Sequence, residues 1–315
     1  MIEFREISKS YGGGTKAIDG IDLKIERGEF VVLIGASGSG KSTLLKMINR
    51  MESHDTGKII FDGRDIDSFD LRELRLRMGY AIQSVGLFPH WTVARNIATV
   101  PRMLGWPLRK INDRVSALLN LFDLEPAVYG ARFPHQLSGG QQQRIGVARA
   151  LAAEPDVLLM DEPFGALDPV IRASLQLEMK RIHQSSGKTI VMVTHDIDEA
   201  LLLATKIVLL ERGKLLQVGA PLELLARPAS ALVTDFVGRS DTGIKLLSLQ
   251  TAQSLARRES AQAGGSLPAA ATLREAVSFF ALHRLAAVNL VDASGKHAGV
   301  LHMADIFSQA EGRGV

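Results

Sequence analysis

The segment at residues 35–43 constrains the fold more than any other stretch, because its sequence GASGSGKST follows the pattern G-x-x-x-x-G-K-[ST]. In this pattern, glycines let the backbone curl around an anion, while the lysine and the hydroxyl residue contact phosphates and Mg²⁺. The apolar run EFVVLI precedes it at residues 29–34, and apolar residues at helical spacing follow at residues 42–49. The sequence therefore predicts a strand, a phosphate-binding loop and a helix. Lys41 is expected to contact the β- and γ-phosphates of a nucleoside triphosphate, and Ser42 is expected to bind Mg²⁺.

Composition narrows the class of protein. The chain has 315 residues, of which 46% are hydrophobic and 23% charged, as expected for a folded soluble protein with one large domain and a small one. The absence of cysteine excludes disulfides and thiolate metal sites. A net charge of +3 and no long Lys/Arg block argue against a nucleic-acid partner. No run approaches the length of a membrane span, and the first residues lack the apolar core of a signal peptide.

Short apolar runs alternate with helical stretches over residues 1–240, which predicts an α/β fold. Alternating residues at 2–7 and 21–25 indicate two half-buried strands. From residue 93 to residue 128 the pattern is helical, so we expect a helical subdomain at about residues 84–150, inserted into the mixed sheet of the core. The composition changes near residues 238–243, and a second domain is expected at 241–315.

A second glycine motif, LSGGQ, occupies residues 137–141 and runs into a helical pattern. Ser138 is suited to the N-cap, and Gly139 and Gly140 leave the free N–H groups of the helix open to an anion. The motif therefore predicts a second phosphate-binding helix end, with a plain helix cap as the alternative.

Two acidic residues, Asp161 and Glu162, end the run DVLLMDE at residues 156–162, after four apolar residues. Two carboxylates at the end of a buried strand are costly unless a cation or a reacting water uses them. We expect Asp161 to hold Mg²⁺, directly or through water, and Glu162 to orient the attacking water. His195 ends another apolar run and is expected near the γ-phosphate. The histidines show no pairing at metal-ligand spacing, so a zinc site is not expected.

Two further residues are ambiguous when each is taken alone. Tyr11 lies just upstream of the phosphate-binding loop, where its ring is either ordinary packing or a stacking surface for adenine. Gln83 ends a predicted strand at residues 78–83, where it is either structural or within reach of a metal or water.

The order of these features resembles the ATPase subunit of ATP-binding cassette (ABC) transporters, a P-loop NTPase. The features are Tyr11, the phosphate-binding loop, Gln83, LSGGQ, the acids at 161–162, the GALD segment at 165–168 and His195. The resemblance covers about residues 1–240. It implies that Glu162 is the catalytic base, that His195 contacts the γ-phosphate and that Gln83 couples the metal site to the transport subunit. It implies nucleotide contacts from Tyr11, Gly35, Ser37, Gly38, Gly40, Lys41, Ser42, Thr43, Ser138, Gly139, Gly140, Gln141 and Asp168, and metal ligands Ser42, Gln83 and Asp161.

The resemblance also implies cofactors and partners. ATP and Mg²⁺ are the expected cofactors, and the working unit is expected to be a head-to-tail homodimer in which LSGGQ closes over the ATP of the opposite subunit. Asp168 would communicate between the two sites. The remaining partners would be transmembrane permease subunits and a solute-binding protein, with this chain peripheral on the cytoplasmic face of the inner membrane. The segment at residues 88–91, which holds Phe88 and Trp91, is our hypothesis for the permease docking site.

Two features narrow the transported solute by resemblance. The segments KMINR at residues 46–50 and GLFPH at 86–90 are similar to ATPases of osmoprotectant importers, which take up glycine betaine, choline, carnitine or proline. Residues 271–307 resemble one cystathionine-β-synthase (CBS) module, in which His302 replaces the hydroxyl residue of the ligand-binding pattern and Asp305 is retained. Such a tail would regulate the subunit or dimerise it. The alternatives are an importer of another small polar solute, such as an amino acid or polyamine, and a soluble ABC ATPase.

Overall fold

The computed structural model describes residues 1–12, 16–82, 86–165, 167–238, 241–261 and 265–308. The chain divides into two compact units, Met1–Leu224 and Leu225–Val315. This division lies earlier than the boundary expected near residue 240. The change in composition there marks the end of a helix, since Gly238 closes helix α11 (Ala231–Val237) with a positive φ of 89°, whereas the contacts of the chain separate within helix α10 (Pro221–Ala226).

A six-stranded sheet forms the centre of the first unit. All of its neighbouring pairs are parallel except the pair of β9 with β10. Its central strands have almost no polar side chains and are buried along their length, as parallel strands covered on both faces require. In spatial order the strands are β10 (Lys214–Gly219), β9 (Lys206–Glu211), β3 (Phe30–Ile34), β8 (Thr189–Val193), β7 (Val157–Asp161) and β6 (Met78–Ala81).

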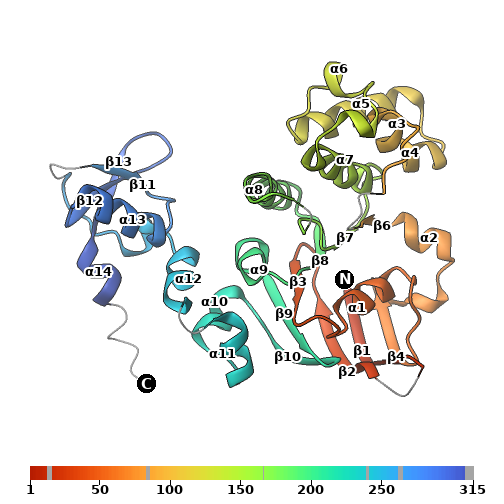
Figure 1. Ribbon diagram of the computed structural model, residues 1–315, viewed down its shortest axis with the longest axis horizontal. Coiled ribbons are helices and arrows are strands. Elements are labelled where there is room, and N and C mark those ends of the chain that lie inside the picture. Colours follow the sequence, from red (N-terminus) through yellow and green to blue (C-terminus); the bar gives the residue numbers. More distant parts are fainter. Residues whose placement is uncertain (13–15, 83–85, 166, 239–240, 262–264, 309–315) are drawn as a thin grey trace. The chain divides into compact units, whose positions relative to one another are not determined.

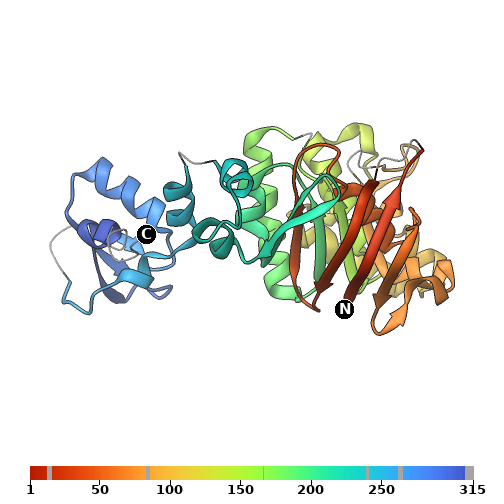
Figure 2. The same cartoon turned by 90° about the horizontal axis from the view of Figure 1, so that it is seen from below.

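A second, antiparallel sheet lies in the same unit, and Figure 2 shows its red and orange strands side by side. Its order is β2 (Lys16–Ile25), β1 (Ile2–Ser10), β4 (Thr56–Phe61) and β5 (Arg64–Asp65). The apolar residues of its alternating strands share one buried cluster with the central sheet and with helix α1 (Lys41–Ile48). Phe4 on β1, Leu44 on α1 and Val31 on β3 are all members of this cluster. Helix α1, and with it the loop that precedes it, is therefore fixed by the main core.

The described residues between β6 and β7 form helices and no strand, as expected for the helical subdomain (Figure 1). Helix α5 is amphipathic and buries Ile111, Val115, Leu118 and Leu119. The helices are α3 (Val93–Ile97), α4 (Thr99–Met103), α5 (Leu108–Leu121), α6 (Pro126–Tyr129), η2 (Pro134–Gln136) and α7 (Gly139–Leu151).

The remaining helices of the first unit connect its strands. Helix α8 ends at Gly187, whose left-handed conformation (φ 60°) is the usual helix stop. The connecting helices are η1 (Ile66–Ser68), α2 (Leu71–Leu76), α8 (Pro169–Ser186) and α9 (Ile197–Leu203).

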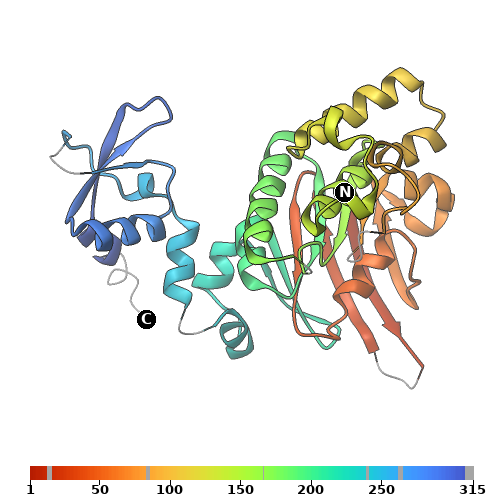
Figure 3. The ribbon, with the colours of Figure 1, turned by 45° about the horizontal axis from the view of Figure 1, so that its top comes forward.

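The second unit has its own small core and a three-stranded sheet in the order β11-β12-β13 (Figure 3). Its core contains Phe280 of helix α13 together with Leu290 and Leu301 of the two long strands. Helix, strand, turn, strand and short helix follow one another as expected for residues 271–307. The elements are α12 (Thr242–Leu249), η3 (Ala252–Leu255), β11 (Ser266–Pro268), α13 (Leu273–His283), β12 (Ala287–Val291), β13 (His297–His302) and α14 (Met303–Ser308).

The described part of the chain contains no helix that is both long and apolar enough to cross a bilayer.

One buried carboxylate, Glu178 on α8, predicts a pH dependence of stability. The residue is only 8% exposed and neither carboxylate oxygen accepts a hydrogen bond, although Arg144 Nε lies 3.4 Å from Oε2. Burial raises the pKa of Glu178; with a smaller upward contribution from Asp123 and opposition from Arg144 and Arg181, the pKa reaches about 7. The folded protein therefore binds more protons than the unfolded protein, so stability is lost as the pH rises from about 4.5 to about 7.

Glu178→Gln is expected to remove most of this dependence, because the amide cannot ionise. At pH 8 the variant should be more stable than the parent by up to roughly 3 kcal/mol, and at pH 5 the two should be similar. Thermal unfolding of both proteins at pH 5, 6.5 and 8 measures this, with the exposed Glu125→Gln as control. Equal changes in Tm with pH for Glu178→Gln and the parent would contradict the assignment.

Candidate functional site

The phosphate-binding loop leaves strand β3 and enters helix α1, as the sequence predicts. A Cβ atom on Gly35 (φ 147°) would lie 2.0 Å from the Leu210 carbonyl oxygen, and one on Gly40 (φ 99°) would lie 2.5 Å from the Ala17 carbonyl oxygen. Gly40 is also the N-cap of α1, in the left-handed conformation. Both positions therefore require glycine for two reasons, the backbone angle and the close approach of a neighbouring strand or turn.

Lys41 is folded over this loop. Its side chain is buried, and Nζ donates to the carbonyl oxygens of Gly35 and Ala36, each at 2.8 Å. Burial lowers the pKa of Lys41, while the negative charges of Glu162 and Asp161 oppose that shift. A buried ammonium gains from an anionic partner, and phosphate oxygens can replace the two carbonyl oxygens that hold it.

The two acids lie where strand β7 ends. Ser42 Oγ donates to Asp161 Oδ1 at 2.8 Å, although the two residues are 119 positions apart in the chain. Glu162 follows in the left-handed region (φ 46°), and its amide donates to the Val193 carbonyl oxygen of β8. Glu162 Oε1 lies 3.5 Å from His195 Nδ1. The folded chain thus brings together the loop hydroxyl, both acids and the histidine that the sequence singled out.

A pocket of about 510 Å³ lies over this group. Tyr11 forms part of its wall and is 46% exposed, as a stacking surface requires. Ala17 and Ser39 also line the pocket and were not among the expected residues. Gly35 and Asp161 are not in its lining. The lining residues are Tyr11, Ala17, Ser37, Gly38, Ser39, Gly40, Lys41, Ser42, Thr43, Glu162 and His195.

The LSGGQ motif begins helix α7 and does not line that pocket. Ser138 and Gln141 form a reciprocal cap, in which Ser138 Oγ accepts from the Gln141 amide at 3.3 Å and Gln141 Oε1 accepts from the Ser138 amide at 3.0 Å. A Cβ on Gly140 would lie 2.3 Å from Ile171 Cγ2, so this glycine permits close packing of α7 on α8. Gly139 is exposed, with no atom within 4 Å of an added Cβ.

Two other expected residues have different outcomes. Asp168 is the N-cap of α8, where its Oδ1 accepts from the amides of Val170 and Ile171 at 3.1 Å each, and it does not line the pocket. Gln83, expected as a metal ligand and as the link to the transport subunit, lies outside the described residues.

A buried polar network next to His195 was not predicted from the sequence. Glu199 on α9 accepts hydrogen bonds from Thr194 and Gln176, and all three side chains are buried. The only available signal was a polar residue one position before the histidine, Thr194, and another four positions after it, Glu199. This pattern is indistinguishable from an ordinary helix start.

Comparison with known proteins agrees with the site. A family model described as ABC transporter matches residues 18–165. The chain is 54% identical over 310 residues to the glycine betaine uptake system ATP-binding protein YehX of Escherichia coli (strain K12), covering 98% of this chain and 100% of that protein. It is 53% identical over 239 residues to the glycine betaine/carnitine/choline transport ATP-binding protein OpuCA of Bacillus subtilis (strain 168), covering 76% of this chain and 63% of that protein.

Among solved structures, the chain is similar to a dimeric, post-hydrolysis state of an ATP-binding cassette bound to ADP and Pi. The two share 31% sequence identity with a TM-score of 0.62, over 70% of this chain and 99% of the other. The glycine-lined loop, the acids at the end of β7 and these similarities agree with one another. The chain belongs to the ATP-binding subunits of ABC transporters and is an ATPase of that family.

Proposed function

We propose that this ATPase powers an importer of quaternary-amine osmoprotectants such as glycine betaine, choline or carnitine. The supporting observation is the 54% identity to the E. coli glycine betaine protein, which extends over 98% of this chain and therefore includes the second unit. The nucleotide pocket gives no information on the solute, because the solute binds to other subunits. An importer of an amino acid or a polyamine remains the alternative.

Uptake of labelled solutes tests the proposed substrate class. Cells that lack other betaine uptake would express the permease and solute-binding protein together with either wild-type subunit or Glu162→Gln. Uptake of glycine betaine that requires the wild-type subunit is the expected result. Uptake of an amino acid or polyamine instead, with betaine uptake equal in both strains, would assign the transporter to the alternative class.

In this proposal, Lys41 and the amides of the loop bind the phosphates of ATP, and Tyr11 stacks on the adenine. Ser42 and Asp161, with their oxygens 2.8 Å apart, form an oxygen donor set of the kind that Mg²⁺ prefers. Mg²⁺ bound there would neutralise charge on the phosphates. Glu162 accepts a proton from the attacking water, and His195 contacts the γ-phosphate from the turn after β8.

We propose that two subunits join head to tail, so that residues 137–141 of one subunit complete the nucleotide site of the other. Two observations support this arrangement. The pocket over the loop lacks the LSGGQ residues of its own chain, and Gly139 faces open space at the start of α7. The N-terminus of a helix suits an anion, here one supplied from outside the subunit. The similar solved cassette is itself dimeric.

Mixing two inactive variants tests the dimer. Gly139→Glu places a carboxylate in open space without strain in its own subunit, and it should repel the nucleotide of the partner. Lys41→Ala disables the loop. Each variant alone should be inactive, whereas their mixture should recover roughly a quarter of wild-type ATPase activity, because each heterodimer keeps one intact site. Gly139→Ala is the control with a small side chain. No recovery in verified heterodimers would place each site within one subunit.

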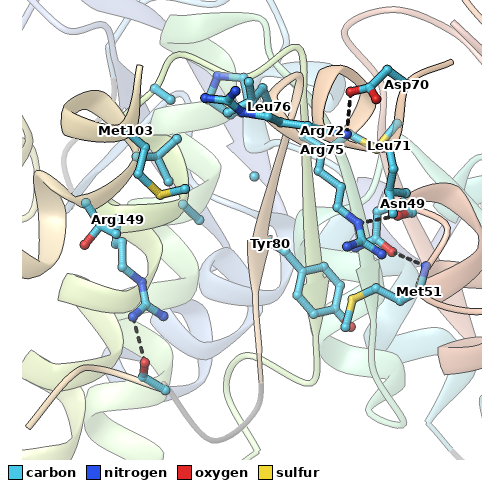
Figure 4. A pocket seen from close by; sticks show the side chains of 18 of the residues that line it. Asn49, Met51, Asp70, Leu71, Arg72, Arg75, Leu76, Tyr80, Met103 and Arg149 are labelled. Atoms are coloured by element: carbon cyan, nitrogen blue, oxygen red, sulfur yellow. Dashed lines mark hydrogen bonds between the residues drawn. The ribbon is translucent and has the colours of Figure 1, made fainter. Parts of the chain in front are cut away.

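The surface proposed for permease docking is a groove of about 860 Å³ in the first unit. Figure 4 shows Tyr80 and Leu71 on its core side and Met103 on the side of the helical subdomain. Arg149 lines the same groove, and its Nη1 donates to the Gly86 carbonyl oxygen at 2.7 Å. The walls are largely apolar, which suits a short amphipathic helix from a permease.

The expected docking segment at residues 88–91 only partly meets this groove. Phe88 lines the groove and is 44% exposed, while Trp91 does not line it and packs against Phe88 with ring centroids 4.4 Å apart. Phe88 is therefore the residue of that segment that we propose to contact the permease, and Trp91 supports its ring.

Met103→Glu tests the groove, because docking would bury the new carboxylate without a partner. Co-purification with the permease should weaken by on the order of 100-fold, while ATP binding by the isolated subunit stays unchanged. Leu108→Glu is a matched control, since Leu108 and Met103 are both 64% exposed and Leu108 lies outside the groove. Equal retention of the permease by Met103→Glu and wild type would remove this groove from the docking interface.

We further propose that the second unit contains one CBS-like module, with a regulatory or dimerising role. Asp305, the retained residue of the ligand pattern, pairs with Arg257, whose Nε lies 2.7 Å from Oδ2. His302 Nε2 lies 2.9 Å from Glu259 Oε2. Both residues of the pattern thus have partners within the unit, which favours a structural role over nucleotide binding.

Association with a permease would hold the whole subunit peripherally at the cytoplasmic face of the membrane.

A further inference from the structure

A buried carboxylate lies directly behind the turn that carries His195. Glu199, on the first turns of α9, is only 5% exposed. Its Oε2 accepts a hydrogen bond from Thr194 Oγ1 at 2.6 Å. The same threonine oxygen accepts from the Asp196 amide at 3.1 Å, so the hydroxyl proton is directed to Glu199. The Thr194 hydroxyl, just before His195, therefore holds the amide of Asp196, just after it. Glu199 sets the orientation of this hydroxyl.

The other oxygen of Glu199 reaches helix α8. Gln176 Nε2 donates to Glu199 Oε1 at 3.0 Å, and the pair is buried. One turn earlier on α8, Arg172 Nη2 donates to the Leu167 carbonyl oxygen, and its Nη1 lies 3.9 Å from Asp196 Oδ2. Helix α8 thus contacts Glu199 through Gln176, and it contacts the turn after His195 through Arg172. Its N-terminus follows the acids of β7 after a short connection.

The backbone completes the attachment. The Thr194 amide donates to the Leu33 carbonyl oxygen of β3, the strand that leads into the phosphate-binding loop. The His195 side chain itself is 65% exposed and lies 3.5 Å from Glu162. An exposed side chain depends on its backbone for position, so the network behind it determines where the imidazole lies.

We propose that Glu199 is a positioning residue for ATP hydrolysis, which holds His195 at the γ-phosphate through Thr194 and fixes that turn to α8 through Gln176. The inference rests on the proposed role of His195. Replacing the carboxylate with alanine removes the acceptor of the Thr194 hydroxyl proton and of the Gln176 amide in a buried site, which frees the turn. Small displacements of a positioning group have large effects on rate.

Steady-state hydrolysis by Glu199→Ala tests the proposal. The kcat should fall about 10- to 100-fold, while the affinity for ATP changes less than about threefold, because the loop and Tyr11 are untouched. Glu199→Gln should recover most of the activity, since its carbonyl can accept from Thr194 and the Gln176 amide can rotate to accept from its NH₂ group. Thr194→Val keeps the volume of the side chain and removes only the hydroxyl, so a folded variant with lowered kcat is expected even if Glu199→Ala does not fold.

A double variant separates positioning from stability. In a His195→Ala background, Glu199→Ala should cause no further loss of kcat, because the group that it positions is gone. The same fractional loss in both backgrounds would overturn the proposal, as would wild-type kcat for Glu199→Ala and Thr194→Val. Wild-type turnover by His195→Ala would instead refute the role of His195 on which the inference rests.

Discussion

Glu162→Gln should lose ATP turnover by at least about 100-fold while it still binds ATP, because the amide keeps the size of the side chain and cannot accept a proton. The structure places Glu162 on the pocket wall, beside His195 and directly after the strand that positions Asp161. Its left-handed backbone turns the residue out of the strand and toward the loop. Trapped ATP should also favour the dimer, since the nucleotide that joins the two subunits is no longer cleaved.

Phosphate release and size-exclusion chromatography with ATP measure the two effects. Glu125→Gln is the matched control, because Glu125 is an exposed carboxylate in the helical subdomain far along the chain from the acids. The control should hydrolyse ATP at the parent rate and show no additional dimer. Parent-like turnover by Glu162→Gln would exclude Glu162 as the base.

Lys41→Ala should weaken nucleotide binding, with an affinity for ATP reduced at least roughly 100-fold. In the proposed binding mode the buried ammonium of Lys41 contacts the phosphates, and its two present carbonyl partners lie in the loop itself. Stability without nucleotide should not fall, because the variant removes the cost of burying a charge.

Titration with a fluorescent ATP analogue measures the affinity, and thermal unfolding without nucleotide measures the stability. Lys46→Ala is the control, since Lys46 lies in the last turn of the same helix, away from the loop. If Lys41→Ala bound the analogue as tightly as Lys46→Ala, the phosphates would have to bind elsewhere.

Much of the fold follows from local patterns. The apolar run at β3 predicted a strand, which is buried along its length, and the alternation in β1 predicted a strand with one face in the core. Ser138 as the cap of α7 was also predictable, because a serine followed three residues later by glutamine matches the reciprocal cap. The helical nature of residues 93–128 was evident from spacing and from the absence of strand patterns.

Contacts between residues that lie far apart in the chain could not be predicted from local patterns. The hydrogen bond from Ser42 to Asp161 depends on β3 and β7 delivering their ends to one edge of the sheet, which no local pattern encodes. The pairing of Gln176 with Glu199 likewise depends on how α8 packs beside α9. The groove near Tyr80 is formed by segments that lie far apart in the chain, so only Phe88 was identified beforehand. The expected domain boundary near residue 240 followed composition, whereas the contacts divide the chain at Leu224.

The most direct test of the account is hydrolysis by the complete transporter in proteoliposomes, with solute-binding protein outside and this subunit and ATP inside. Glycine betaine outside should stimulate ATP hydrolysis and drive its own accumulation, and vesicles with Glu162→Gln should show neither effect. Accumulation of betaine by the Glu162→Gln vesicles, or hydrolysis that betaine leaves unchanged while another solute stimulates it, would contradict the account.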